Sequence, residues 1–368
     1  MNPERSPVFM PRFIWTEPAR GGYPDPDFIE LSGLERLRSF VKGRMPSPPM
    51  QHLFGLRPVE AGIGTCTALT PASPWLQSHT GLYTGGVGAL VADAALGGAV
   101  ASGLGPWMGL ATSQLSMNFL RPAGPWSGRL SARGKLIHTT PTVGLSEVYV
   151  EDGEGRLLAH GTSRCFLQRF DPSAPIAPPA VSAVAGPYDS PDPYLRPVEG
   201  TTLPPSTWER MTGLEFVRAV IGGDIGPAPV SLLLGMTILD ADDGVATTTA
   251  PAHEWLCAPE ARVYGGVTAY MAHDTMAVAV QTMLPKATSY ATLDLTVNFV
   301  RPIPADGRAL QARARVFHRG RTFAVAGAEV VNADGKTVAT ASSSSIILPG
   351  RPFPNQGDFA QEFPSAAG

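Results

Sequence analysis

The sequence predicts an α+β protein made of two tandem domains, each a curved antiparallel sheet wrapped around one long central helix. Three observations support this prediction. A constant shift of 180 positions (211 minus 31) aligns residues 31–167 with 211–347 without a gap. Each copy contains one long apolar helix pattern, and each helix is followed by a run of alternating strands. One long helix followed by antiparallel strands is typical of a sheet that packs one face on that helix.

The repeat is easiest to see in two short stretches. LSMNFLRP at 115–122 returns as LTVNFVRP at 295–302, and SGLERLRSF at 32–40 returns as TGLEFVRAV at 212–220. A unit of this length is a domain, because solenoid repeats have only about 20–50 residues. Residues 171–205 contain ten prolines and little periodicity, which indicates a semi-rigid linker. We expect an N-terminal arm, a first domain, the linker, a second domain and a C-terminal tail at 1–30, 31–170, 171–205, 206–350 and 351–368, respectively.

The elements of one copy can be placed in order. A short amphipathic helix comes first, because Leu34, Leu37, Phe40 and Val41 have helical spacing. A proline-rich bend and a first strand follow, and a Gly-Gly turn then opens the long helix. The remaining sequence alternates as strands do, with a hairpin turn at EDGEG. The long helices are expected at 86–102 and 266–283, and the later strands of the first copy near 111–120, 128–138, 143–152 and 156–168.

Composition and charge narrow the class of protein. The chain has 368 residues, of which 43% are hydrophobic and 16% charged, so it is long and apolar enough to bury large cores as a soluble globular protein. A net charge of -3 without a long basic cluster argues against a nucleic-acid partner. Cys66, Cys165 and Cys257 are widely spaced and form no CxxC pair, which argues against a disulfide framework and favours a reducing cytoplasm.

Two segments bear on membranes and targeting. The first residues lack the apolar run of a signal peptide, so we expect a loose, proline-punctuated arm there. The run at 85–105 is rich in glycine and alanine and carries Asp93, which indicates a buried helix rather than a membrane span. The sequence has no P-loop, no nucleophile elbow and no metalloprotease spacing, so we expect no metal and no nucleotide hydrolysis.

Asp93 is the most conspicuous candidate for chemistry. It is a lone carboxylate about two turns into an otherwise apolar helix, where aspartate is a poor helix former and an unpaired buried charge is costly. A structural role, with a backbone N–H or an arginine as partner, is the alternative. The Gly85-Gly86 and Gly265-Gly266 pairs open the two long helices, so their N–H groups are available to a carbonyl oxygen that becomes negative. Alternatively, the glycines only make a tight turn or pack on the sheet.

Taken together, these motifs carry a family resemblance. GLExLR, the Gly-Gly pair followed eight residues later by an acid, NFLRP, HRGR and a DG hairpin resemble the hotdog-fold thioesterases of the phenylacetic-acid-pathway type. The resemblance covers about 31–168 and 206–348 and implies a double hotdog, in which one chain imitates a homodimer and hydrolyses acyl-CoA thioesters at the seam between the copies. It also implies that the acid acts as nucleophile or general base and faces the glycine turn of the other copy. The expected site is Asp93 with Gly265 and Gly266.

The second copy departs from the family pattern. His273 stands where Asp93 stands in the first copy, and Asp274 follows it, rotated by about 100° around the helix. We therefore expect the site of His273, Gly85 and Gly86 to be inactive or purely structural, with His273 as a base of its own as the alternative. The family usually has histidine just before the glycine pair, where it orients the turn or the substrate. This chain departs from the pattern with Tyr264, which we expect at the first site, and Thr84, which we expect with His273 and Asp274 at the second.

The resemblance also implies contacts to coenzyme A, which is part of the substrate and the only cofactor-like group expected. Phosphates call for arginine or lysine, and the candidates by family position are Arg121, Arg301, Arg319 and Arg321. Surface salt bridges are the alternative for each arginine. Asn118 and Asn298 are candidates for substrate binding, or they hold a strand edge.

Two other functions compete with thioester hydrolysis. The hydratases of the same superfamily use an aspartate with a histidine five residues later, and none of the seven histidines has this spacing, so hydration of enoyl-CoA is disfavoured. A non-catalytic acyl-CoA binding or sensing protein, with both sites decayed, is the rival hypothesis. The resemblance also implies that two chains can associate as a homodimer with four hotdog domains. The length and the aliphatic or aromatic nature of the acyl group stay open.

Overall fold

The structure is a computed structural model that describes residues 12–174, 181 and 183–353. The rest of the expected N-terminal arm (1–11) and C-terminal tail (354–368), and residues 175–180 and 182 of the linker, lie outside the described residues. A five-residue helix, α1 (Arg12–Thr16), precedes the first repeat, and α5 (Pro205–Arg210) precedes the second.

The two repeats have parallel orders of elements. The first repeat contains α2 (Gly33–Val41), α3 (Pro49–Phe54), β1 (Arg57–Gly62), β2 (Thr65–Pro71), α4 (Gly85–Ala101), β3 (Met108–Phe119), β4 (Arg129–Thr139), β5 (Val143–Glu151) and β6 (Leu157–Arg169). The second contains α6 (Gly213–Gly222), α7 (Pro229–Leu234), β7 (Thr237–Asp242), β8 (Val245–Pro251), α8 (Gly265–Thr282), β9 (Thr288–Thr292), β10 (Asp294–Phe299), β11 (Ala309–Arg319), β12 (Phe323–Val331) and β13 (Thr337–Pro349). The expected α+β class is therefore confirmed.

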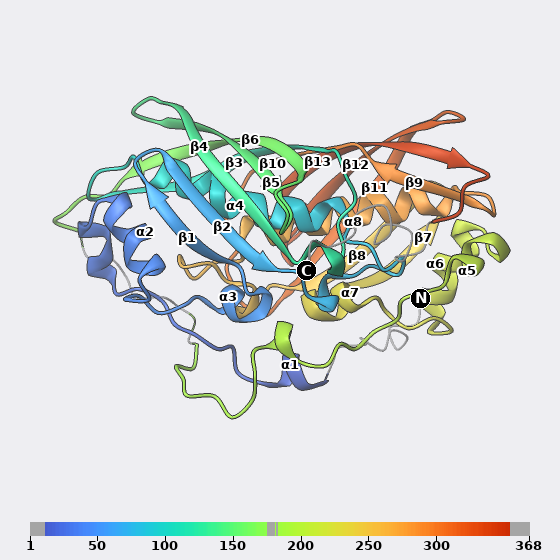
Figure 1. The fold of residues 1–368 in the computed structure, drawn as a ribbon, viewed down its shortest axis with the longest axis horizontal. Coiled ribbons are helices and arrows are strands. Elements are labelled where there is room, and N and C mark those ends of the chain that lie inside the picture. The colour runs from blue at the N-terminus through green and yellow to red at the C-terminus, as the bar shows by residue number, and fades with distance from the viewer. Residues whose placement is uncertain (1–11, 175–180, 182, 354–368) are drawn as a thin grey trace.

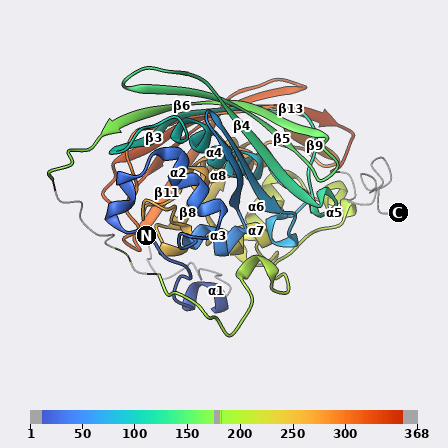
Figure 2. The same cartoon turned by 60° about the vertical axis from the view of Figure 1, so that its left-hand side comes forward.

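All thirteen described strands belong to one antiparallel sheet with the order β1-β2-β4-β5-β6-β3-β10-β13-β12-β11-β8-β7, and β9 pairs with β13. The sheet arches over α4 and α8, which lie side by side beneath it (Figures 1 and 2). The two repeats join where β3 pairs with β10, and Ser116 lies opposite Thr296, its equivalent 180 positions later. Their hydroxyl oxygens are 3.3 Å apart. A residue that faces its own repeat equivalent marks an approximate two-fold axis, so the halves pack as an intrachain pseudo-dimer.

The helices approach the sheet closely because glycine removes side chains at the contacts. A Cβ on Gly134 of β4 would lie 2.2 Å from the Ala95 carbonyl oxygen of α4, and one on Gly98 would lie 2.5 Å from Cys66 Sγ. The glycine and alanine run that looked like a membrane span is thus a core helix. No helix in the described part of the chain is long and apolar enough to cross a membrane.

The SGLE and TGLE repeats begin α2 and α6 as capping boxes. The Ser32 hydroxyl accepts from the Glu35 N–H while Glu35 accepts from the Ser32 N–H, and Thr212 and Glu215 repeat this exchange. Two otherwise unpaired donors are satisfied at each helix start. The glycine between them is required as well, because a Cβ on Gly33 would lie 1.7 Å from the Ala101 carbonyl oxygen.

The bend before the long helix contains more structure than the sequence indicated. The proline-rich segments form the short helices α3 and α7, and the single expected strand is a hairpin of two strands, β1–β2 or β7–β8. Gly64 and Gly244 make the hairpin turns at φ values of +71° and +72°, which glycine adopts without strain. The strand expected near 111–120 is continuous as β3, whereas its counterpart is divided into β9 and β10.

The described part of the N-terminal segment is packed, whereas most of the first residues, for which the sequence predicts a loose arm, lie outside the described residues. Ile14 is fully buried, and its carbonyl accepts from the indole of Trp255 in the second repeat at 2.9 Å. The linker makes the equivalent contact with the first repeat, because the Arg196 carbonyl accepts a hydrogen bond from the indole of Trp75 at 3.0 Å. Buried Arg20 joins the two segments through the Ser190 carbonyl at 2.7 Å. The arm, which precedes the first repeat, is therefore hydrogen-bonded to the second repeat, and the linker, which precedes the second repeat, is hydrogen-bonded to the first. Figure 1 shows both segments on the side of the molecule away from the sheet.

Candidate active site

Asp93 and the Gly265-Gly266 turn meet where α4 of the first repeat crosses the start of α8 of the second. Only 5% of Asp93 is exposed. Its Oδ2 lies 2.8 Å from the place that a Cβ on Gly265 would occupy. The Thr112 hydroxyl of β3 donates to Oδ1 at 3.1 Å, and the Gly266 N–H interacts with the same carboxyl group. The expected acid and the expected opposite glycine turn are thus brought together in what we call the first seam.

Burial dominates the electrostatics of Asp93. Loss of solvent raises the pKa of the carboxyl group to about 6, while the bonds from Thr112 and Gly266 act to lower the pKa and nearby Glu260 acts to raise it. A carboxyl group with a pKa of about 6 is mostly ionised at neutral pH and yet accepts a proton readily. Both properties suit a general base, and the ionised form suits a nucleophile.

The glycine turn is shaped by what surrounds it. A Cβ on Gly266 would lie 2.5 Å from the Tyr264 ring and 2.9 Å from the Leu90 backbone, so glycine is needed for the two helices to approach. The Tyr264 hydroxyl donates to the Leu90 carbonyl at 2.8 Å and so ties the helices together across the seam. This contact fits the expected orienting role of the residue before the glycine pair.

One amide of this turn is available to a ligand. The Val267 and Thr268 N–H groups donate to the Tyr264 carbonyl at 3.1 and 3.3 Å. The Gly266 N–H interacts with Asp93. Within the described residues no hydrogen bond is made by the Gly265 N–H, and Gly265 is half-buried, so its donor is not sealed from solvent. A helix N-terminus with a free N–H and a positive dipole end can stabilise a developing oxyanion.

The second seam has the same outline and different chemistry. His273 of α8 is 2% exposed, and its Nε2 lies 2.9 Å from the place of a Cβ on Gly85, beside Thr84 and Gly86 at the start of α4. Burial lowers the pKa of His273 to about 4, so the imidazole is neutral at physiological pH. Asp274 lies on another side of the helix, where it accepts from the Tyr270 hydroxyl at 3.4 Å and burial raises its pKa to about 6. Among the residues that the structure describes, the atoms nearest to the Cβ position of Gly85 belong to Phe119 and His273 and not to a carboxylate.

The predicted coenzyme A contacts do not gather at the first seam. Arg121 donates to the Leu157 carbonyl at 2.7 Å, and its repeat equivalent Arg301 donates to the Thr337 carbonyl. These matched contacts fix the starts of β6 and β13. Asn118 and Asn298 are exposed and alternate with inward-facing residues such as Leu115 and Met117, so they lie on the sheet face away from the helices.

Arg319 and Arg321 are exposed at the β11–β12 turn. The equivalent turn of the first repeat is followed by Gly144, where a Cβ would lie 2.4 Å from Val100 near the C-terminal end of α4. By this equivalence the two arginines lie near the C-terminal end of α8. The Gly265-Gly266 turn lies at the other end of this helix, which has 18 residues and is about 27 Å long, so the arginines lie far from the first seam. Phosphate binding by these arginines stays a prediction.

Two residues at the first seam were not found from the sequence. Thr112 is a neutral residue in an alternating strand, and nothing in that pattern distinguishes it from its neighbours. Glu260 precedes the Gly265 turn by five residues, follows a proline and belongs to no periodic pattern, so nothing in the sequence distinguishes it. Its effect on Asp93 arises across the two repeats, so only the folded structure reveals it.

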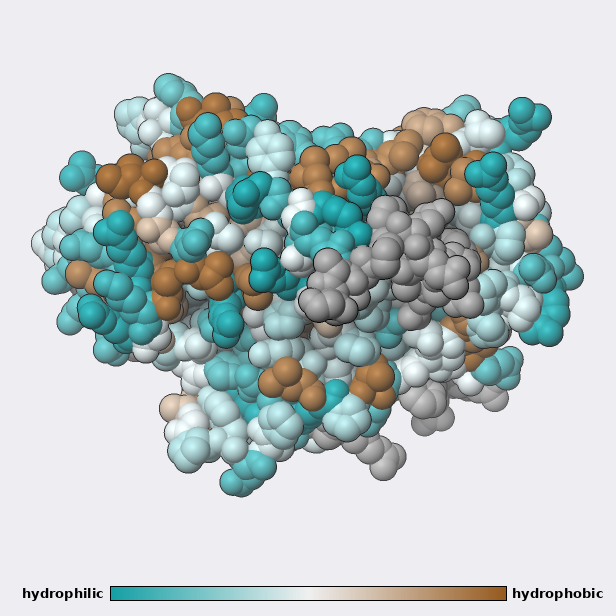
Figure 3. Space-filling view, viewed as in Figure 1, coloured by the Kyte–Doolittle hydropathy of each residue, from teal (hydrophilic) through white to brown (hydrophobic). Residues whose placement is uncertain are grey.

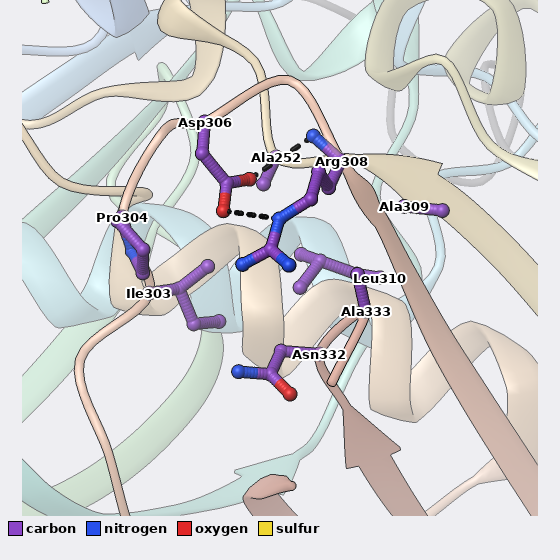
Figure 4. A pocket seen from close by; sticks show the side chains of 9 residues that line it. All are labelled: Ala252, Ile303, Pro304, Asp306, Arg308, Ala309, Leu310, Asn332 and Ala333. Carbon is purple, nitrogen blue, oxygen red and sulfur yellow. Dashed lines mark hydrogen bonds and ion pairs between the residues drawn. The ribbon is translucent and has the colours of Figure 1, made fainter. Parts of the chain in front are cut away.

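Two cavities in the described structure are lined by residues away from both seams. One, of about 10 Å³, has room for a single water molecule and is lined by residues of the second repeat that include the Asp306–Arg308 pair (Figure 4). The other is an open depression of about 460 Å³ on the sheet, lined by residues of β1, β2, β4 and β5 such as Lys135 and Tyr149. Neither lining includes Asp93 or a glycine pair. No cluster of three or more potential metal ligands occurs among the residues that the structure describes.

Comparisons with known proteins agree with this architecture. The thioesterase superfamily model matches the chain twice, at residues 81–159 and 261–339, so the two matches are themselves 180 positions apart. A putative esterase of Halobacterium salinarum is 38% identical over 128 residues, which are 33% of this chain and 83% of the relative.

Solved structures extend the comparison to the whole fold. The tesB protein of Mycobacterium avium subspecies paratuberculosis has a TM-score of 0.51 at 14% identity, covering 86% of this chain and 100% of that chain, a likeness that concerns the fold alone. The PaaI protein from the Escherichia coli phenylacetic acid degradation operon is 28% identical, covering 33% of this chain and 85% of that chain, with a TM-score of 0.31. The chain belongs to the thioesterase superfamily of thioester hydrolases, as two tandem hotdog domains.

Proposed function

We propose that the protein hydrolyses acyl-CoA thioesters to free acid and coenzyme A at the first seam. The observation that supports this most is the approach of Asp93 Oδ2 to Gly265, at 2.8 Å from its Cβ position, because it joins an acid of one repeat to a helix N-terminus of the other. Thioester hydrolysis needs an ionised group to attack or to activate water, and a donor for the carbonyl oxygen. Asp93 and the Gly265 N–H are the two groups that would meet these needs.

The chemistry can proceed in two ways with the same residues. As a general base, Asp93 takes a proton from water, and the hydroxide attacks the carbonyl carbon. As a nucleophile, the carboxylate itself attacks and forms an anhydride, which water then hydrolyses. In both routes the Gly265 N–H donates to the carbonyl oxygen as it becomes negative, the C–S bond breaks, and coenzyme A leaves as the thiol after receiving a proton. Thr112 positions the carboxyl group through its bond to Oδ1.

In this proposal the second seam does not hydrolyse thioesters. His273 replaces the acid, and because burial lowers its pKa to about 4, the imidazole is a weaker base than the Asp93 carboxylate, whose pKa is raised to about 6. Asp274 interacts with Tyr270 rather than with the turn. One hydrolytic site per chain follows.

A thiol-release assay over short, long and aromatic acyl-CoAs tests the proposal. We expect turnover with at least one acyl class and no turnover of the corresponding oxygen esters of comparable size. Purified protein that binds acyl-CoA by calorimetry and releases no thiol from any class would instead identify an acyl-CoA binding or sensing protein.

A further inference from the structure

His273 is a buried polar side chain without a partner. It is 2% exposed, and in the described structure neither ring nitrogen has a hydrogen-bond partner. A buried donor without a partner loses its hydration and gains nothing in return, so such a group in a folded core calls for an explanation. Its equivalent in the first repeat, Asp93, interacts with Thr112 and Gly266.

The unpaired ring faces a second set of unpaired donors. Its Nε2 points to the start of α4, 2.9 Å from the Cβ position of Gly85. Of the first-turn amides there, the Val87 N–H donates to the Thr84 carbonyl, whereas the Gly85 and Gly86 N–H groups make no hydrogen bond with any described residue. At the first seam the equivalent Gly266 amide interacts with a carboxylate. In the tautomer that carries its proton on Nε2, the His273 ring and the Gly85 and Gly86 amides are donors that face one another, and the nearby Thr84 hydroxyl, also buried, makes no hydrogen bond with any described residue.

Other neighbouring groups do not supply an acceptor for these donors. The Phe119 ring meets the imidazole edge to face, with centroids 5.8 Å apart at 84°, and such a contact replaces a hydrogen bond only weakly. Asp274 interacts with Tyr270 on a different side of α8. Burial, rather than any nearby charge, is what lowers the pKa of His273, so a buried carboxylate ligand would find no cation to offset its loss of solvation. A neutral carbonyl oxygen avoids that cost.

We propose that the second seam binds an acyl thioester through its carbonyl oxygen without hydrolysing it, the oxygen accepting from the His273 ring N–H and the Gly86 amide. This inference rests on the proposed function only for the class of ligand. Thr84 and Gly85 are half-buried, so the ligand reaches the seam at the start of α4. Entry requires the half-buried Phe119 ring, which lies 2.6 Å from the Cβ position of Gly85, to turn aside.

The test uses ligands that neither seam can hydrolyse. Acyl-CoA analogues with a methylene group in place of the thioester sulfur keep the carbonyl, and S-alkyl-CoA thioethers of the same length lack it. Short, long and aromatic members of both series are titrated into the wild-type protein by calorimetry and by NMR of the imidazole nitrogens. His273→Phe identifies the His273 signals and removes the donor, and His273→Gln keeps an N–H donor.

We expect two equivalents of the ketone analogue per chain, a shift of the His273 nitrogen signals on binding, and an affinity at the second site reduced about tenfold in His273→Phe and largely restored in His273→Gln. The thioether should leave the His273 signals unchanged. A single equivalent of every ketone analogue with unchanged His273 signals would overturn the proposal and leave an ordered water as the acceptor. Either folded variant suffices to identify the His273 signals, and where neither folds the number of ketone equivalents bound by the wild-type protein decides the outcome. Thiol release from true substrates is measured separately, so the proposed function stands or fails on its own result.

Discussion

At the level of single residues, the burial of Asp93 has opposite consequences for chemistry and for stability. Burial raises the pKa to about 6, which makes the carboxylate a better proton acceptor at neutral pH. The same burial makes the ionised form costly to keep inside the fold. Catalytic use of Asp93 would explain why this cost is retained in a helix that is otherwise apolar.

Activity should therefore depend on the ionisation of Asp93. We expect kcat/KM to fall about tenfold per pH unit below about pH 6, because only the ionised acid attacks or activates water. Thr112→Val removes a hydrogen bond that lowers this pKa, so it should shift the profile to higher pH and reduce kcat about tenfold. Thr292→Val, at the equivalent position of the second repeat, is the control. Identical pH profiles for the two variants and the wild type would exclude Thr112 as a positioning residue.

The stability of the fold should show the opposite dependence. Because the folded-state pKa of Asp93 lies near 6, above its ordinary value of 3.8, its contribution to stability is present below about pH 4 and lost as the pH rises through 6. Asp93→Asn keeps the shape and removes the charge, so it should raise the free energy of unfolding at pH 8 by an amount on the order of 1–3 kcal/mol. Urea unfolding at pH 8 and pH 4 measures this. A variant that is less stable than wild type at pH 8 would contradict the account.

Prediction from the sequence succeeded for residues whose type is unusual for their surroundings. Asp93 could be found because a single charge in an apolar helix requires a reason, and the glycine pairs could be found because they open both helices. Thr112 and Glu260 could not, because their types are ordinary in a strand and a loop. Their importance arises only from contacts that the fold brings together across distant segments.

At the level of elements, α4 and α8 are each used twice. The start of each helix supplies a glycine turn to one seam, and the middle of each supplies a side chain, Asp93 or His273, to the other. Eight residues, about 12 Å of helix, separate the two contributions. The exchange of one acid for histidine therefore changes one seam without disturbing the other, and the helices pack in the same way on both sides.

The glycine turn of the first seam should be more sensitive than glycine elsewhere on the same helices. A Cβ on Gly265 would lie 2.8 Å from Asp93 Oδ2, so Gly265→Ala should push the carboxyl group from its place and reduce kcat at least a hundredfold. Gly97→Ala in α4 is the matched control, because its Cβ would meet only Leu110, at 4.0 Å. Circular dichroism verifies the folding of both. Equal thiol-release rates for the two variants would show that the Gly265 turn takes no part in hydrolysis.

Long helices and strands could be predicted from the sequence, whereas short helices and a tight hairpin could not. The long helices and the later strands were placed within a few residues of their observed bounds, because hydrophobic periodicity is strong over long segments. The sequence predicts one strand where the structure has the β1–β2 hairpin, because the turn at Gly64 is short and the β1 segment, RPVEAG, does not alternate between apolar and polar residues. The helices α3 and α7 have only six residues, too few for a periodic pattern.

At the level of the whole molecule, the duplication provides two facing halves in one chain. The pairing of β3 with β10 joins the sheets across the pseudo-two-fold axis, and the arm and linker each hold a tryptophan of the opposite repeat. These contacts of the arm and the linker could not be predicted from the sequence, because proline-rich segments have no periodic pattern that indicates which surface they pack against. Their effect is to bind each connecting segment to both halves.

The surface bears on assembly into larger oligomers. Exposed hydrophobic residues recur at equivalent strand ends, as in Ile137 and Phe317, or Val143 and Phe323. On the face shown in Figure 3 the hydrophobic residues lie in several separate patches. The expected homodimer of two such chains stays a prediction that sedimentation can measure.

The central claim is that one acid of the first repeat performs hydrolysis against the glycine turn of the second. Single-turnover thiol release by Asp93→Asn tests it most directly, with Asp274→Asn as the control, because that carboxyl group has a similarly raised pKa of about 6 but does not face a glycine turn. We predict a loss of at least a thousandfold for Asp93→Asn and near wild-type release for Asp274→Asn. Wild-type release by a folded Asp93→Asn protein would contradict the account.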